Sequence, residues 1–93
     1  MYLTGNENKL VEVEVKQDQN NLGWVYRDDI DFLILDIGAE MLTVDFKAIR
    51  KIVEVKAKEH GKVYSDAPKL YHIRKDEHGG AYFYLHENDI KNA

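Results

Sequence analysis

The 93-residue sequence contains no cysteine, only one proline and no long run of apolar residues. Without cysteine the chain can form no disulfide, no thiolate zinc site and no cysteine nucleophile. No apolar run approaches the ~20 residues that span a bilayer, so no membrane association is expected. The first ten residues, MYLTGNENKL, lack the charged start and the apolar stretch of a secretory signal. A cytoplasmic location is therefore expected.

Hydrophobic residues make up 44% of the chain and charged residues 32%, which is typical of a folded domain with one core. We expect a single domain over 1–93, with a strand meander at 10–57, a loop with one short strand at 58–68 and a C-terminal hairpin at 69–90. The net charge of −4 is uneven: residues 1–46 carry ten acids and three basic residues, and residues 47–93 carry seven acids and ten basic residues. The acidic first half should repel nucleic acid.

Alternating apolar residues predict a mainly β fold. Val11, Val13 and Val15 alternate with charged residues, as in a half-buried strand. Further strands are predicted at 22–27, 30–37 and 41–46, with a turn at Asp28 and Asp29. The core is expected to consist of Val11, Val13, Val15, Val25, Phe32, Ile34, Val44, Phe46, Ile49 and Val53.

Residues 45–61 fit two structures. Asp45 could cap a helix that has Phe46, Ile49 and Val53 on one side and ends at Gly61. The same stretch also alternates, and its β-branched residues favour a strand. We interpret it as a strand.

The C-terminal segment predicts a hairpin around the loop DEHGG, residues 76–80. With Lys75 opposite Ala81, Ile73 lies opposite Phe83 and Tyr71 opposite Leu85. These four apolar residues then share one face. The other face carries Leu70, His72, Arg74, Tyr82, Tyr84 and His86, and it is either an exposed aromatic binding surface or is buried against the rest of the protein.

Residues 23–55, GWVYRDDIDFLILDIGAEMLTVDFKAIRKIVEV, resemble the Sm-like fold, especially its bacterial RNA-chaperone branch. The matching positions are Gly23, Asp29, the run Phe32 to Leu35, Phe46-Lys47-Ala48-Ile49 and Ile52-Val53. The resemblance implies a small, partly open antiparallel barrel of the Sm-like or SH3-like kind with the hairpin as an extension. It also implies subunits that pair through edge strands.

The chain departs from the family at its RNA-binding positions. Sm proteins bind a base with an Asn where this chain has Leu33, and with an Arg-Gly pair where it has Arg50 and Lys51. The bacterial branch has Tyr-Lys-His where this sequence reads Asp45-Phe46-Lys47. Since stacking and base contacts need aromatic and amide groups, RNA binding by the family mechanism is not expected.

No pattern of residues indicates a catalyst, a metal site or a cofactor. Asp29 and Asp31 begin like a calcium loop, but Leu33 and Ile34 follow where an acid or amide and a Gly are needed. His72 and His86 lie close enough to share a metal, but no third ligand is fixed. No nucleophile has an evident base. We therefore expect neither an enzyme nor a bound metal or cofactor.

The sequence is most consistent with a non-catalytic binding or assembly module that contacts itself or a protein partner. The alternative is an Sm-like binder of RNA or single-stranded nucleic acid. Both hypotheses use the same candidate binding residues: His72, Arg74, Tyr82, Tyr84, His86, Lys47, Arg50 and Lys51.

Overall fold

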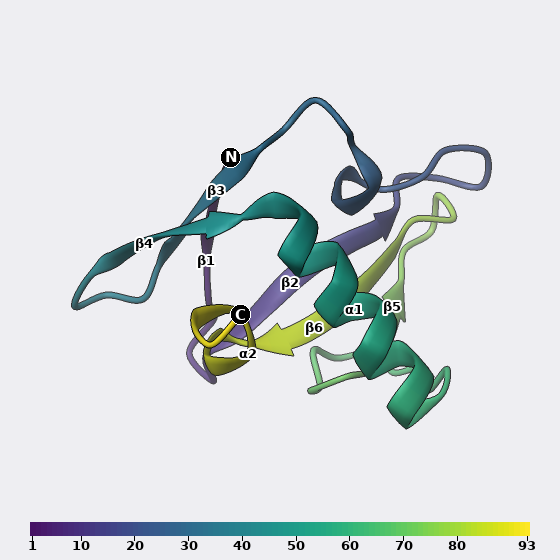
Figure 1. Ribbon diagram of the computed structural model, residues 1–93. Helices are drawn as coiled ribbons and strands as arrows, with labels where there is room; N and C mark the ends of the chain where they lie inside the picture. Colours follow the sequence, from purple (N-terminus) through teal and green to yellow (C-terminus); the bar gives the residue numbers. More distant parts are fainter.

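The computed structural model describes all residues, 1–93, and shows six strands in two three-stranded sheets with two α-helices (Figure 1). In chain order the elements are β1 (Tyr2–Thr4), β2 (Leu10–Lys16), the 3-10 helix η1 (Trp24–Tyr26), β3 (Phe32–Asp36), β4 (Met41–Asp45), α1 (Phe46–His60), β5 (Ile73–Lys75), β6 (Ala81–His86) and α2 (Glu87–Lys91). The mainly β class is confirmed. The strands form two separate sheets, and no closed barrel is found.

The first sheet has the strand order β1-β3-β4, with β1 parallel to β3 and β3 antiparallel to β4. Its inner face carries the buried side chains of Leu33, Leu35 and Val44. Phe32 and Ile34 were expected in the core, but they point outward and are 62% and 40% exposed. Side chains alternate along a strand, so only one half of the apolar run FLIL can face the core. The buried half is Leu33 and Leu35, so the prediction for Phe32 and Ile34 is wrong.

The second sheet has the order β2-β6-β5 and is antiparallel throughout. The predicted hairpin register is confirmed where Ile73 pairs with Phe83 and Lys75 with Ala81. The hairpin is not an extension, because β6 also pairs along its length with β2 and is the central strand. The expected Tyr71–Leu85 pair is absent, since Tyr71 has a φ of 61° and leaves the strand conformation.

Residues 46–60 form an α-helix, so the strand expected there is wrong. The Asp45 carboxylate caps the helix by accepting a hydrogen bond from the Lys47 N–H at 3.0 Å. One side of α1 is buried and carries Phe46, Ile49 and Val53. Burial stabilises by roughly 1.5–3 kcal/mol per large side chain, which outweighs the few tenths by which a β-branched residue disfavours a helix. Gly61 ends the helix with a φ of 72°, a conformation that suits glycine.

The predicted strand at 22–27 is also wrong, because this segment forms η1. The Gly23 N–H donates to the carbonyl of Val15 at 3.1 Å, which brings the two backbones close together. A Cβ at position 23 would lie 2.2 Å from the carbonyl oxygen of Glu14, so only glycine fits. After this contact the chain turns, and Trp24 packs against Phe46 with ring centroids 6.0 Å apart.

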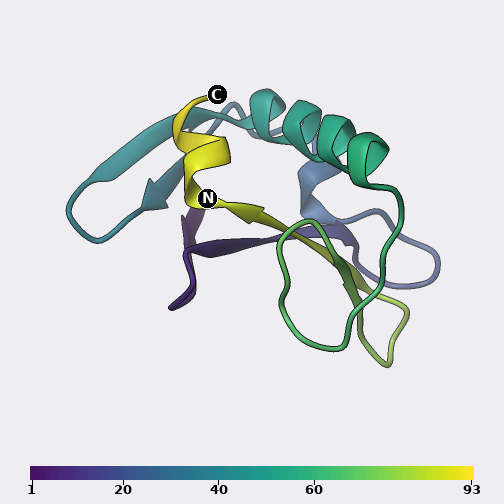
Figure 2. The same ribbon diagram turned by 90° about the horizontal axis from the view of Figure 1, so that it is seen from below.

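The core lies between the two sheets and α1, which covers the inner side of β2 and β6 (Figure 2). Both sheets, η1 and both helices contribute to one continuous cluster: Val11, Val13, Val25, Leu33, Leu35, Val44, Phe46, Ile49, Val53, Phe83, Leu85 and Ile90. Val15, expected in this core, is only partly buried. Residues 61–72 form a loop with a single bridge from Tyr64 to Ile73, and Tyr71 of this loop packs against the cluster.

A pair of phenylalanine variants tests which side of each strand is buried. Phe83→Ala should lower the free energy of unfolding by about 3–5 kcal/mol, because it leaves a cavity in the core. Phe32→Ala should change it by no more than about 0.5 kcal/mol, because that ring is exposed. Urea unfolding measures both values. Similar losses in the two variants would show that the placement of β3 is wrong.

Candidate functional site

The predicted aromatic face lies on the side of the β2–β6–β5 sheet that is turned away from α1 (Figure 2). Tyr84, at its centre, is only 2% exposed, so it is not available to a partner. Its hydroxyl donates to the Glu12 carboxylate at 2.7 Å and accepts from Arg74 Nε at 2.8 Å. Arg74 also pairs with Glu12 at 3.2 Å. Of the two alternatives left open for this face, burial holds for Tyr84, because side chains of β2 and β5 close over it.

The neighbouring residues of this face are also engaged in contacts within the protein. Tyr82 is half-buried, and its hydroxyl donates to Asp76 at 3.1 Å. The Arg74 guanidinium carbon lies over the Tyr82 ring, 4.8 Å from the ring centroid. Burial is the main reason that the pKa values of Tyr82 and Tyr84 are raised. His86 caps α2, since its Nδ1 accepts from the Asn88 N–H at 3.0 Å. These contacts fix the two side chains against the hairpin loop and the start of α2.

The three basic residues predicted to assist this face lie on α1, and the structure does not bring them together with the hairpin. Arg50 donates to the carbonyl oxygens of Val25 at 2.9 Å and Arg27 at 2.7 Å, and it pairs with Asp28 at 3.3 Å. Its guanidinium therefore ties η1 to α1. Lys47 and Lys51 are exposed, but α1 covers the opposite side of the sheet from Tyr82 (Figure 2).

The four aspartates of residues 28–36 occupy turns and strand ends. Asp28 pairs with Arg50, Asp29 forms two hydrogen bonds with Arg27, and Asp36 accepts from Tyr2 and from the Gly38 N–H. They do not converge on one point. Across the whole chain, no group of three or more His, Asp or Glu side chains is placed to hold a metal ion.

Tyr71 connects the helices with the hairpin. Its ring stacks on His60 of α1 at 4.5 Å and on Phe83 of β6 at 6.3 Å, measured between centroids. Its hydroxyl donates to both carboxylate oxygens of Asp89 on α2, at 2.9 and 3.0 Å. Burial, followed by the Asp89 carboxylate, raises the pKa of Tyr71 to about 12. This side chain therefore stabilises the docking of α2.

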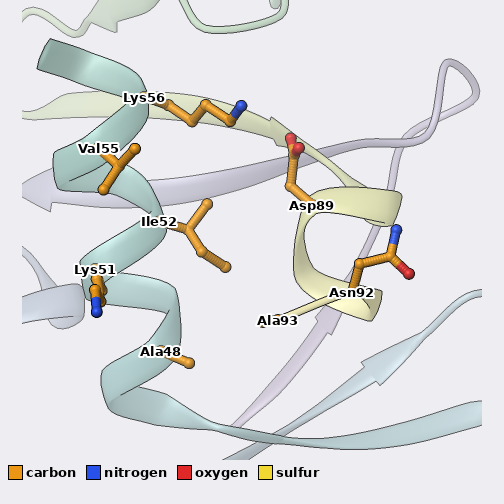
Figure 3. Close-up of a pocket in the computed structure, with 8 residues that line it drawn as sticks. All are labelled: Ala48, Lys51, Ile52, Val55, Lys56, Asp89, Asn92 and Ala93. Atoms are coloured by element: carbon orange, nitrogen blue, oxygen red, sulfur yellow. The ribbon is translucent and has the colours of Figure 1, made fainter. Parts of the chain in front are cut away.

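An apolar groove of about 330 Å³ runs between α1 and α2 (Figure 3). Ala48, Ile52 and Val55 line its α1 side, and Ile52 points toward α2. Lys56 reaches toward Asp89 at one end of the groove (Figure 3). Both of these charged side chains already have partners, because Lys56 pairs with Glu59 at 3.6 Å and Asp89 accepts from Tyr71. Lys51, the third charged side chain of the lining, forms no ion pair, so a single lysine is left to orient a ligand.

The structure reveals an exposed surface that the sequence analysis missed: the outer face of the β1–β3–β4 sheet, here called the outer face. It carries Tyr2, Phe32, Ile34 and Met41, which are 54%, 62%, 40% and 65% exposed. The pairing register places Tyr2 beside Ile34 and Met41 beside Asp36, so these side chains share one side of three adjacent strands. No helix or loop covers this side of the sheet (Figure 2).

Acidic residues surround the outer face. They are Asp31, Asp36, Glu40 and Asp45, and all except Asp36 are exposed. The hydrogen bond from the Tyr2 hydroxyl, followed by that from the Gly38 N–H, lowers the pKa of Asp36, so this carboxylate is charged at neutral pH. Lys47 lies beside Asp31 and Asp45 at one corner. The surface thus combines large apolar side chains with a negative border.

One pattern in the sequence could have indicated this surface. Four consecutive apolar residues, Phe32 to Leu35, supply apolar side chains to both faces of a strand. Such a strand is usually covered on both sides. Here the protein covers only one side, so the other is free for contact with another molecule.

Comparison of the chain with models of protein families, with curated protein sequences and with solved structures finds no match. No activity can therefore be transferred from a relative. Neither helix is long and apolar enough to cross a membrane.

The buried position of Tyr84 is tested with three variants. Tyr84→Ala should cost about 3–5 kcal/mol in the free energy of unfolding, because it leaves a cavity. Tyr84→Phe keeps the ring and loses only hydrogen bonds, so it should cost about 1 kcal/mol. The control is Tyr64→Ala, which removes an exposed ring and should cost less than about 0.5 kcal/mol. An exposed Tyr84 would make Tyr84→Ala as mild as the control in urea unfolding.

The raised pKa of Tyr71 predicts a pH dependence of stability. A folded pKa of about 12 exceeds the ordinary value of 10.0, so the unfolded chain loses this proton first as the pH rises. The contribution of Tyr71 is therefore complete below about pH 10 and decreases between about pH 10 and 12. In Tyr71→Phe this component is absent. The difference in unfolding free energy between wild type and variant should stay constant below about pH 9 and shrink above pH 10, and a constant difference up to about pH 11 contradicts the assignment.

Proposed function

We propose that this protein is a non-catalytic binding module that docks another protein on its outer face. The observation that carries the proposal is the set of four large apolar side chains exposed on the same side of three adjacent strands. Scattered exposed apolar residues are normal on protein surfaces, whereas a contiguous group with a polar border is typical of a protein-binding site. The rigid sheet beneath holds these side chains in place before a partner arrives.

The apolar side chains provide the driving force for binding. Burying a fully exposed Phe, Ile or Met contributes roughly 1.5–3 kcal/mol, and ordering both partners consumes part of this gain. Phe32 and Met41, the most exposed of the four, are the strongest candidates for anchor residues. Tyr2 adds an aromatic ring whose hydroxyl is already satisfied by Asp36.

The negative border selects the chemistry of the partner. Asp31, Glu40 and Asp45 are exposed and outnumber the two lysines beside them, Lys47 and Lys91, of which Lys91 pairs with Glu40 at 3.7 Å. A second copy docked through the same face by a twofold axis would place acids against acids. A partner with an apolar centre and a lysine- or arginine-rich rim is therefore favoured over self-association.

The surfaces predicted from the sequence contribute unequally to this proposal. Pairing through edge strands remains part of the proposal, because β1 and β4 are the edges of the sheet that carries the outer face. The hairpin face contributes less, since Tyr84 is buried. Nucleic-acid binding through Lys47, Arg50 and Lys51 is disfavoured because Arg50 is engaged with carbonyl oxygens and acids lie close to Lys47.

A displayed library of random peptides provides a probe of stated chemistry for the outer face. Peptides selected on the wild-type protein should combine apolar residues with Lys or Arg. Phe32→Ala and Met41→Ala should each weaken binding of these peptides by roughly 5- to 100-fold, as loss of an anchor residue does, without lowering the melting temperature. Fluorescence anisotropy of a labelled selected peptide measures the affinity.

The matched control is Leu22→Ala, which removes an equally exposed apolar side chain, 66% exposed, from outside the β1–β3–β4 sheet. It should leave peptide binding unchanged. Selected peptides that are indifferent to Phe32 and Met41 would refute the proposed surface. A wild-type dimer in sedimentation that dissociates on Phe32→Asp would show that the occupant is a second copy and overturn the charge argument.

A further inference from the structure

A second surface of different chemistry lies at the end of the β2–β6–β5 sheet that is remote from α2. There the last residue of β2 meets the first of β6 and the last of β5. Two isolated bridges extend the sheet at its edges. Leu22 pairs with Lys16 of β2, and Tyr64 pairs with Ile73 of β5. The resulting groove, here called the basic groove, has a volume of about 420 Å³. This volume lies in the range of small-molecule binding sites.

The basic groove carries three lysines and no acidic residue in its lining. Lys16 comes from β2, Lys62 from the segment after α1, and Lys75 from β5. None of the three forms an ion pair. The nearby Asp18 is occupied by hydrogen bonds from Asn20 and Asn21 in its own turn. In a protein of net charge −4, this concentration of unpaired positive charge favours an anionic ligand.

Aromatic side chains flank these lysines on both sides of the groove. Tyr26 of η1 lies toward the β2 edge, and Tyr64, 53% exposed, lies toward the β5 edge. Lys75 Nζ lies 4.6 Å from the Tyr64 ring centroid, so a ligand on this ring would be within reach of a cation. The base of the groove is apolar and comes from β2, β5 and β6. The groove thus offers two tyrosine rings and apolar side chains to a flat ring.

We propose that the basic groove binds an aromatic base that carries a phosphate. The ring would stack on Tyr64 or Tyr26, and the lysine ammonium groups would hold the phosphate. An unpaired base is required, because the rings of a duplex are already stacked and cannot reach a tyrosine. The ligand is thus a free nucleotide or a nucleotide of a single strand. The groove is separate from the outer face, which belongs to the other sheet.

The test uses the full-length chain and three probes: adenosine monophosphate, inorganic phosphate and a fluorescein-labelled ten-nucleotide single strand, as RNA and as DNA. Nuclear magnetic resonance titration follows the small probes, and fluorescence anisotropy follows the oligonucleotides. Tyr64→Ala should weaken binding of the nucleotide probes by roughly 5- to 100-fold, whereas Tyr64→Phe keeps the ring and should bind as the wild type does. Lys62→Gln should weaken single-strand binding and lower its salt slope by about 0.7.

Two controls make the result specific. Lys58→Gln removes the same charge from an exposed position on α1 outside the groove and should have no effect. Phe32→Asp alters only the outer face and should also leave nucleotide binding intact, so failure of the protein-docking proposal would be visible separately. Saturable binding of the mononucleotide assigns the groove to free nucleotides, and binding of the oligonucleotide alone assigns it to a single strand.

Three results would overturn the inference. The first is absence of saturable binding of both adenosine monophosphate and the single strands up to about 1 mM. The second is binding of inorganic phosphate as tight as that of the nucleotide with no response to Tyr64→Ala, since that describes a simple anion site. The third is a loss from Lys58→Gln equal to that from Lys62→Gln, since the binding would then depend on overall charge alone.

Discussion

The apolar side of α1 is the contact on which the rest of this fold depends. Phe46, Ile49 and Val53 fill the space between two three-stranded sheets that share no strand pairing with each other. Arg50, which follows Ile49 on the same helix, fixes η1 through two carbonyl oxygens. Because this single long helix packs between the two sheets, no helix covers the other side of β1, β3 and β4 (Figure 2). The exposed apolar side chains of the outer face follow directly from how the core is built.

Local patterns predicted the elements whose neighbours lie close in sequence. The register around the DEHGG loop was correct because a short loop fixes which residues pair, and the alternation of β2 was correct because the period of two is local to the strand. The helix at 46–60 was misread because its β-branched residues favour a strand locally, whereas burial against both sheets decides the structure. Asp45 and Gly61, the capping residues at the two ends of this segment, indicated the helix more reliably than the alternation between them indicated a strand.

The predictions that failed concern contacts between distant parts of the chain. Alternation correctly separated Tyr84 from Phe83, but Tyr84 is buried by Glu12, which is 72 positions away in sequence. Similarly, β1 pairs in parallel with β3, and three residues are too few to show a pattern of their own. The basic groove draws its lysines from three separate segments, so no local motif could have indicated it. Local sequence patterns do not indicate sites whose residues are brought together by long-range pairing.

The two surfaces differ in charge as well as in shape, and this difference separates their partners. The outer face is bordered by acids and would repel a polyanion, whereas the basic groove would repel an acidic protein rim. The uneven charge of the two halves of the sequence only partly accounts for this division, because Lys16 comes from the acidic half and completes the groove. In the folded protein, acidic residues therefore gather around the outer face and lysines around the basic groove, on different sheets. Because the two surfaces lie on different sheets and share no residue, the two proposed ligands would not compete for the same side chains.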